Sequence, residues 1–361
     1  MNRGTSRIFC QFLFAAAFAL VLVGCGAKQS NSKQETTGQV PKRETTGQAY
    51  TPPKNTPPAP EPVRSPPRKE KPAGKVIQIG SAPEGIIADS KTGLVAVSLS
   101  NPDGLALVDS NSGKVVRKTT LPESARHLGL AAPGGPVLVP AERADSLIQV
   151  SLPDGKILSE TKVGNFPHNA AAAKNGRIFV VNEFESTMSV IEDGHVVKTL
   201  KTLLQPGAVA VTEDGLVGVV GVRGLGLEIY DANTLKSLGR IDAGEGPSHL
   251  VTGPGDRFYV ADTRGGAVLV YAARPELKQL YRVSLPGSSP YGLAIDPEHD
   301  RLWVTLTAKN RLIELDLSGG APRKVASYPT FQQPNGVAVD SSSGRVFVAG
   351  RTEDKLQILD P

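Results

Sequence analysis

Residues 75–361 consist of one sequence unit repeated seven times, and this repeat restricts the possible folds more than any other feature of the chain. The units open at Pro83, Ala125, Pro167, Pro206, Pro247, Pro290 and Pro334, so their spacings are 42, 42, 39, 41, 43 and 44 residues. Each unit contains four apolar runs that are too short for helices and are separated by Gly, Asn or Asp turns. A period near 41 residues with four strands per unit indicates the blades of an all-β, seven-bladed propeller.

The repeat also predicts how the ring closes. The last unit ends after only three strands, whereas a surplus strand at residues 75–79 precedes the first unit. This strand matches the fourth strands of other units, such as residues 114–118 and 195–199. We therefore expect the N-terminal strand to complete blade seven and to pair with the last strand of the chain, which leaves no open sheet edge between the first and last blades.

One blade resembles a known repeat family. Residues 163–168 (VGNFPH), 177–182 (RIFVVN) and 186–194 (STMSVIEDG) are similar to the corresponding strands of YVTN-repeat β-propellers. Blades five to seven, with FYVADTRGGAVLVY, PYGLAID and PNGVAVD, resemble the related NHL-type repeat. The resemblance covers about residues 75–361. It implies a propeller whose ligands bind at the mouth of the central channel.

The first 25 residues resemble a bacterial lipoprotein signal. Arg3 and Arg7 precede an apolar run over residues 8–23, and small residues lead to Cys25. We predict that residues 1–24 are a signal peptide and that Cys25 is lipidated, for example with palmitate. Two or three acyl chains anchor a protein stably on a membrane, whereas one chain binds only marginally. The predicted location is the extracytoplasmic face of a cell membrane, at the cell surface or in the periplasm.

The segment 25–74 has the composition of a linker. It is rich in Lys, Gln, Thr and Pro, with nine prolines between residues 51 and 72, and it contains few residues that could form a core. We expect a disordered, semi-rigid spacer between the lipidated cysteine and a propeller over residues 75–361.

Charge and cysteine content exclude several classes of function. Residues 1–74 carry eleven Lys and Arg against four Asp and Glu, whereas residues 75–361 carry 29 against 31. The repeat domain therefore lacks the basic character of a nucleic-acid-binding protein, and no nucleic-acid partner is expected. Both cysteines, Cys10 and Cys25, precede the domain, so it contains no disulfide and no cysteine metal site. We expect a monomer.

Polar side chains follow the opening residue of most units, and the propeller resemblance places them around the channel mouth. The candidate binding residues are Glu84, Arg126, His127, His168, Asn169, His249, Tyr291 and Asn335. Three imidazoles and a carboxylate around one axis are suited to hold a divalent metal, or one histidine to act as a general base. The alternative is that these side chains cap strand ends and form hydrogen bonds between blades.

Two enzyme families share parts of this pattern. Residues 82–85, Asn169 and residues 334–336 are similar to the metal-ligand segments of gluconolactonase propellers. Virginiamycin-lyase-like propellers have seven blades and a histidine at the channel mouth. A metal-dependent lactonase or lyase that uses Glu84, His127, His168, His249 and Asn335 is therefore the alternative function.

The loops between the second and third strands supply candidate rim residues, namely Arg143, Arg223, Arg264 and Arg351. Arginine in such loops is suited to bind carboxylate or phosphate. Acidic residues in the same loops balance these charges, which favours a protein, glycan or small-molecule partner over a polyanion. The preferred function is a membrane-anchored binding or scaffold module that acts through its channel face.

Overall fold

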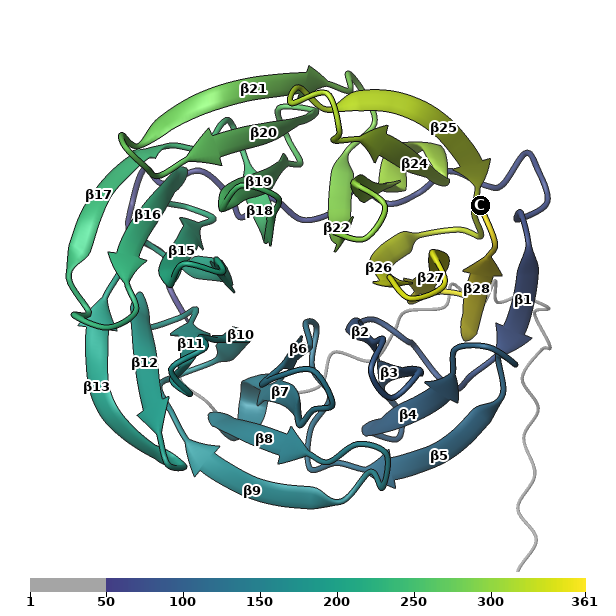
Figure 1. The fold of residues 1–361 in the computed structure, drawn as a ribbon, viewed down its shortest axis with the longest axis horizontal. Coiled ribbons are helices and arrows are strands. Elements are labelled where there is room, and N and C mark those ends of the chain that lie inside the picture. The colour runs from purple at the N-terminus through teal and green to yellow at the C-terminus, as the bar shows by residue number, and fades with distance from the viewer. Residues whose placement is uncertain (1–49) are drawn as a thin grey trace, which may run out of the picture. The chain divides into compact units, whose positions relative to one another are not determined.

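The computed structural model describes residues 50–361, and these residues form seven four-stranded antiparallel sheets arranged in a ring (Figure 1). The prediction of a seven-bladed propeller is confirmed. Blade one consists of β2 (Ile86–Asp89), β3 (Leu94–Leu99), β4 (Gly104–Asp109) and β5 (Val115–Thr120), and blade two of β6 (Gly129–Leu130), β7 (Val137–Ala141), β8 (Ser146–Val150) and β9 (Ile157–Lys162). Blade three consists of β10 (Pro167–Ala172), β11 (Ile178–Asn182), β12 (Thr187–Glu192) and β13 (His195–Lys201), and blade four of β14 (Pro206–Val211), β15 (Leu216–Gly221), β16 (Gly226–Asp231) and β17 (Ser237–Asp242).

The remaining strands complete the ring. Blade five consists of β18 (Pro247–Gly253), β19 (Arg257–Asp262), β20 (Ala267–Ala272) and β21 (Lys278–Ser284), and blade six of β22 (Pro290–Asp296), β23 (Arg301–Leu306), β24 (Arg311–Asp316) and β25 (Arg323–Pro329). Blade seven consists of β26 (Pro334–Asp340), β27 (Arg345–Gly350), β28 (Lys355–Leu359) and β1 (Lys75–Gln78). Two single-turn 3-10 helices, η1 (Glu142–Ala144) and η2 (Thr307–Lys309), lie between the second and third strands of blades two and six.

The burial of each strand follows from its position in the blade. The second strand, such as β3 or β11, is buried along its whole length, whereas the fourth strand, such as β5 or β13, is largely exposed. Both faces of the middle strands are covered by neighbouring blades, and strands of this kind are continuously apolar. The outer strands carry many Lys, Arg and Thr residues instead.

The hydrophobic core is divided into seven clusters, each between two adjacent blades. Between blades four and five, for example, Leu227 packs with Phe258 and Leu269. The single tryptophan, Trp303, lies in the cluster between blades six and seven and is 2% exposed. A single blade could not bury both of its faces, so the ring is stabilised by contacts between neighbours.

The ring closes as the sequence predicts. The strand β1 pairs antiparallel with β28, with Val76 opposite Gln357 and Ile77 opposite Leu356. Ile77 packs against the core cluster between blades seven and one, whereas Val76 is 36% exposed. The N-terminal strand therefore supplies both hydrogen bonds and apolar contacts to the last blade.

The innermost strands begin at one face of the ring, where their opening residues surround the channel. In five blades the residue just before the opening proline has a positive φ, between 45° and 61°. These residues are Ala82, Phe166, Gln205, Ser289 and Gln333. The loops between second and third strands reach the same face, as the ion pair between His168 and Glu142 shows. We call this side of the ring the channel face.

Residues 50–74 differ from the expected free spacer. They contain no helix or strand, but they lie along the channel face from blade three to blade seven, and the purple trace in Figure 1 follows much of this path. Tyr50 stacks on Phe184 with ring centroids 4.7 Å apart, and Ser65 is only 4% exposed. Main-chain and side-chain hydrogen bonds to the propeller, which composition does not reveal, hold this segment in place. We call residues 50–74 the strap.

The predictions for residues 1–49, including the signal peptide and the lipidation of Cys25, lie outside the described residues. Within residues 50–361, no helix is both long enough and apolar enough to cross a membrane.

Candidate functional site

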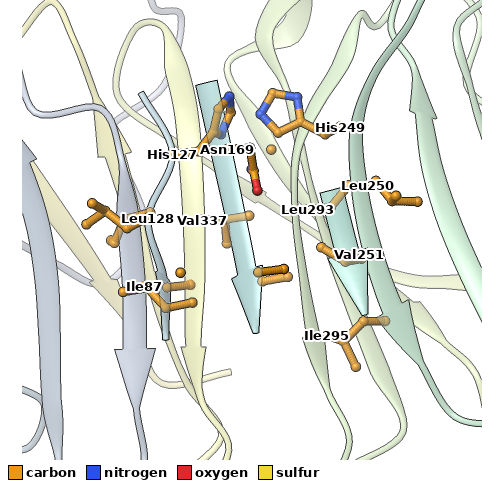
Figure 2. Close-up of a pocket in the computed structure, with 18 of the residues that line it drawn as sticks. Ile87, His127, Leu128, Asn169, His249, Leu250, Val251, Leu293, Ile295 and Val337 are labelled. Atoms are coloured by element: carbon orange, nitrogen blue, oxygen red, sulfur yellow. The ribbon is translucent and has the colours of Figure 1, made fainter. Parts of the chain in front are cut away.

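A cavity of about 430 Å³ occupies the channel (Figure 2). Its walls are apolar and are formed by residues of the innermost strands, including Ile87, Leu128, Val251, Ile295 and Val337. Seven of the eight predicted channel-mouth residues line it, namely Glu84, Arg126, His127, Asn169, His249, Tyr291 and Asn335. The channel thus combines an apolar interior with a polar, charged mouth.

Aromatic rings form a continuous row at this mouth. The centroid of the His127 ring lies 4.8 Å from that of His168 and 4.6 Å from that of His249. The His249 ring in turn lies 4.1 Å from the ring of Tyr291. All three contacts are edge-to-face, the arrangement that aromatic pairs prefer. Residues from four blades, separated by up to 164 positions, are therefore in direct contact.

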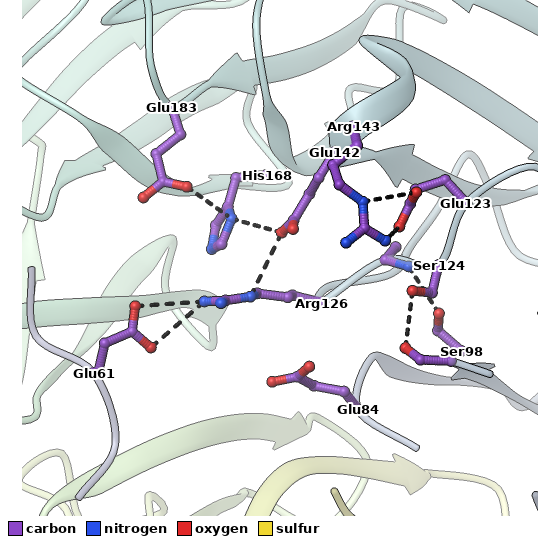
Figure 3. A network of polar contacts seen from close by, with 12 residues as sticks. Glu61, Glu84, Ser98, Glu123, Ser124, Arg126, Glu142, Arg143, His168 and Glu183 are labelled. Carbon is purple, nitrogen blue, oxygen red and sulfur yellow. Dashed lines mark hydrogen bonds and ion pairs between the residues drawn. The ribbon is translucent and has the colours of Figure 1, made fainter. Parts of the chain in front are cut away.

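His168 lies just outside the cavity, between two buried carboxylates (Figure 3). Its Nδ1 atom is 3.0 Å from Oε1 of Glu142 and 3.2 Å from Oε2 of Glu183. Burial by itself would lower the pKa of His168, but the charges of Glu183 and Glu142 outweigh it and raise this pKa above its usual value. Burial would raise the pKa of Glu142, which His168 and Arg126 instead hold below its usual value. Each member of the pair Glu142 and His168 therefore favours the charged form of the other.

The other two histidines of the row, His127 and His249, have lowered pKa values, unlike His168. Burial, together with His168 and Arg126, lowers the pKa of His249 to about 3. Burial and the neighbouring His249, His168 and Arg126 also lower the pKa of His127 well below its usual value. Both imidazoles are neutral at pH 7 and each retains a nitrogen lone pair. Burial raises the pKa of Tyr291, so its hydroxyl remains protonated.

Arg126 is the central cation of the mouth. Its Nε atom lies 3.8 Å from Oε1 of Glu142, and its Nη1 atom lies 3.5 Å from both carboxylate oxygens of Glu61 in the strap (Figure 3). Glu84 has different partners, since its Oε2 lies 3.3 Å from Arg351 and its Oε1 accepts a 3.4 Å hydrogen bond from Asn335. The mouth therefore alternates cationic and anionic groups.

The predicted rim arginines do not form one basic surface. Arg143 is paired with Glu123, and Arg351 with Glu84. Arg223 and Arg264 instead donate hydrogen bonds of 2.5 Å each to main-chain carbonyl oxygens of the strap. Two of the four rim candidates thus bind a peptide backbone.

A metal centre was an alternative prediction for these residues. Within residues 50–361, no group of three or more His, Cys, Asp and Glu side chains is arranged to hold a metal ion. The histidines lie ring against ring, and the Nδ1 atom of His168 faces two carboxylates.

Sequence reasoning missed three polar residues of the channel face. Gln205 donates a 2.6 Å hydrogen bond to Glu183 and accepts one from Arg223. Gln333 donates a 3.2 Å hydrogen bond to Asn335, and Glu61 contacts Arg126. The sequence could have indicated the two glutamines as channel-face residues, because each directly precedes an opening proline. It gave no such indication for Glu61, which lies in a linker-like segment.

No protein-family model matches this sequence, and no curated protein matches it. Solved structures share its fold. The hydrazine synthase of Kuenenia stuttgartiensis has a TM-score of 0.67 at 16% identity, covering 80% of this chain and 99% of that one. A catalytically inactive histidine-to-alanine variant of virginiamycin B lyase from Staphylococcus aureus, with quinupristin, has a TM-score of 0.64 at 16% identity over 79% and 98%. The β-propeller domain of Cps50 from Myceliophteria thermophila has a TM-score of 0.65 at 13% identity over 80% and 100%.

These proteins are similar to this chain in fold, and they include two enzymes, a synthase and a lyase, beside the Cps50 propeller domain. The structures place the chain among the β-propellers. Its function has to be argued from its own residues.

Proposed function

We propose that this chain is a binding module whose channel mouth recognises a ligand that carries a carboxylate. The observation that supports this most directly is the position of Arg126. Its guanidinium lies at the cavity mouth and faces the carboxylate of Glu61, whose side chain is 62% exposed. An exposed ion pair of this kind contributes about 0–1 kcal/mol, so an incoming carboxylate is able to replace Glu61.

The cavity beside Arg126 suits such a ligand. Its volume of about 430 Å³ lies in the range of small-molecule sites, and its walls are apolar while its mouth is polar. A ligand with an apolar part and a carboxylate would place the apolar part in the channel and the carboxylate on Arg126. The neighbouring Glu84 and Glu142 would repel a second negative charge.

For the whole chain we propose a YVTN- or NHL-like propeller anchored through a lipid on Cys25 at the extracytoplasmic face of a cell membrane. The sequence of residues 1–25 supports this location, and the spacing and composition of the repeats support the family. We propose that the propeller acts as a monomer on a protein, glycan or small ligand, with no nucleic-acid partner.

Thermal unfolding of the purified full chain, followed by Trp303 fluorescence, tests carboxylate binding. Hexanoate, phenylacetate and N-acetylleucine, which each carry one carboxylate and an apolar group, are the probes, and a ligand that binds the folded state raises Tm with concentration. We expect at least one probe to raise Tm, and Arg126→Ala to abolish the rise. Arg301→Ala is the matched control, because Arg301 has the same 31% side-chain exposure as Arg126. Arg301 begins β23, at the end of this strand that lies away from the channel face. Equal shifts in both variants, or none in the parent chain, would refute the proposal.

A lyase is the second candidate, and the neutral His249 beside Tyr291 favours it. A neutral imidazole at a cavity mouth is able to accept a proton as a general base. Because virginiamycin B lyase shares the fold and has been solved with quinupristin, quinupristin is the first substrate to test. Mass spectrometry of quinupristin incubated with the full chain and with His249→Ala decides this candidate. Conversion that depends on His249 supports it, and unchanged quinupristin counts against it.

A further inference from the structure

The propeller binds the strap mainly through its carbonyl oxygens. Side chains of blades four to seven donate hydrogen bonds to five of the main-chain oxygens of strap residues 57–66. The donor and acceptor pairs are Arg223 with Pro57 at 2.5 Å, Arg264 with Pro58 at 2.5 Å, Gln333 with Val63 at 3.1 Å, Gln332 with Ser65 at 2.9 Å and Asn310 with Pro66 at 2.8 Å. These donors come from loops that are distant in sequence but adjacent on the channel face.

This pattern matches the chemistry of proline. A proline residue has no N–H group, so a proline-rich segment offers carbonyl oxygens as its main-chain hydrogen-bonding groups. Six prolines lie within residues 57–67. A groove lined with Arg, Gln and Asn donors complements such a segment, and the extended conformation that proline favours lowers the entropy lost on binding.

Two further contacts select particular side chains. Ser65 is 4% exposed; its Oγ donates a 2.6 Å hydrogen bond to the carbonyl of Thr307, and its N–H donates to Gln333 at 2.8 Å. Pro60 is buried beside Gly246, where an added β-carbon would approach it to 3.0 Å. A bulkier residue at position 65 or 246 would not fit these contacts.

We propose that the channel face of blades four to seven is a binding groove for an extended, proline-rich peptide of a partner protein, with a carboxylate over Arg126 and a buried serine four residues later. Strap residues 57–66 fill this groove as an internal copy of that ligand. The role given to Arg126 rests on the proposed function. The donors on the carbonyl oxygens and the Ser65 site are independent of it.

The strap competes with any partner peptide for the groove. A tethered segment has an effective concentration on the order of millimolar, so a peptide in solution competes poorly until the strap is released. Ser65 is the point of release, because an aspartate there would bury a charge against the carbonyl oxygen of Thr307.

The test measures fluorescence anisotropy of a labelled peptide with the sequence of residues 55–68. We expect the full chain with Ser65→Asp to bind this peptide about tenfold more tightly than the parent chain, since the tethered competitor is released. A peptide that carries the same Ser-to-Asp change is the control and should not bind. In the Ser65→Asp chain, Arg223→Ala and Gln333→Ala should each weaken peptide binding at least severalfold, whereas Arg301→Ala should not.

A second variant tests the proposal in case Ser65→Asp does not fold. Glu61→Lys changes a side chain that is 62% exposed and places a cation beside Arg126, so it weakens the strap without disturbing buried contacts. It should also raise the affinity for the unmodified peptide. Folding of both variants is checked by Trp303 fluorescence.

Three results would overturn the proposal. These are the absence of peptide binding to both folded variants, equal affinity for parent and variants, and concentration-dependent dimers that exchange straps. If carboxylates still raise Tm through Arg126 while the peptide does not bind, the groove proposal fails and the proposed function stands. If the peptide binds released chains but Arg126→Ala has no effect in either assay, the proposed function fails and the groove remains.

Discussion

The main-chain oxygen of Glu84 lies so close to Gly336 that a β-carbon on Gly336 would be 2.5 Å from it. This contact joins the innermost strand of blade seven to the start of blade one. It requires glycine because of the space available, and not because of a left-handed φ. Equivalent close approaches occur at other innermost strands, for example between Gly129 and the carbonyl of Ala170.

We therefore expect Gly336→Ala to lower the free energy of unfolding by about 1–3 kcal/mol, the usual cost of overpacking. The backbone of Glu84 would have to move, which also disturbs its contact with Arg351. Urea denaturation followed by Trp303 fluorescence measures the change. Gly319→Ala is the control, because no atom lies within 4 Å of the added carbon. A similar effect of both substitutions would contradict the explanation.

Closure of the ring predicts unequal effects at adjacent positions of β1. Ile77→Ala removes contacts with the cluster between blades seven and one and should cost about 1–2 kcal/mol, below the full range for a buried isoleucine because Ile77 is only partly buried. Val76 points outward, and Val76→Ala should change stability by less than about 0.5 kcal/mol. The same denaturation experiment compares them. A larger loss for Val76→Ala would show that β1 is not seated in this register.

Stability should fall in mild acid because of His249. Its pKa in the folded chain is about 3, whereas an unfolded histidine titrates near 6.5, so the unfolded state gains a proton first as pH falls. The contribution of His249 to the free energy of unfolding is complete above pH 6.5 and decreases toward pH 3. Between pH 7 and pH 5 the free energy of unfolding falls by about 2 kcal/mol from this source. His127 acts in the same direction. His168 acts in the opposite one, because its pKa is raised and its contribution is lost as pH rises.

The measurement is the free energy of unfolding against pH for the parent chain and for His249→Phe, which keeps an aromatic ring against His127 and Tyr291. The variant should show a shallower decrease between pH 7 and pH 5. An identical slope for His249→Phe would rule out this source of acid sensitivity.

The lipoprotein signal predicts covalent modification at Cys25. In a bacterial host fed radiolabelled palmitate, the parent chain should carry label and fractionate with membranes. Cys25→Ser should lose the label and leave the membrane fraction. Cys10→Ser, within the apolar part of the signal, is the control and should retain both. Label that persists in Cys25→Ser would disprove the anchor.

The sequence was sufficient to predict the ring because each blade repeats the same spacing and because the surplus strand at 75–79 had only one vacant position to fill. The same spacing brought His127, His249 and Tyr291 together, since each follows the opening residue of an innermost strand. Periodicity places these three positions around the channel, and their aromatic side chains make the contacts.

The strap was not predictable in this way. Its composition matches a disordered linker, and its order depends on partners as distant as Gln333, which is 268 residues from Ser65. The pairing of His168 with Glu142 and Glu183 was hidden for a related reason. Loop residues were assigned to the correct face, but their side-chain directions depend on the local shape of each turn.

The pairing of β1 with β28 has a consequence for how the protein matures. These strands are about 280 positions apart, so their contact is among the most distant in sequence within the described chain. Blades one to six are able to form in order as the polypeptide emerges, whereas blade seven must wait for Lys355–Leu359. During that interval β1 has no partner strand, so we expect a slow final step to favour incorrect pairing at its open edge.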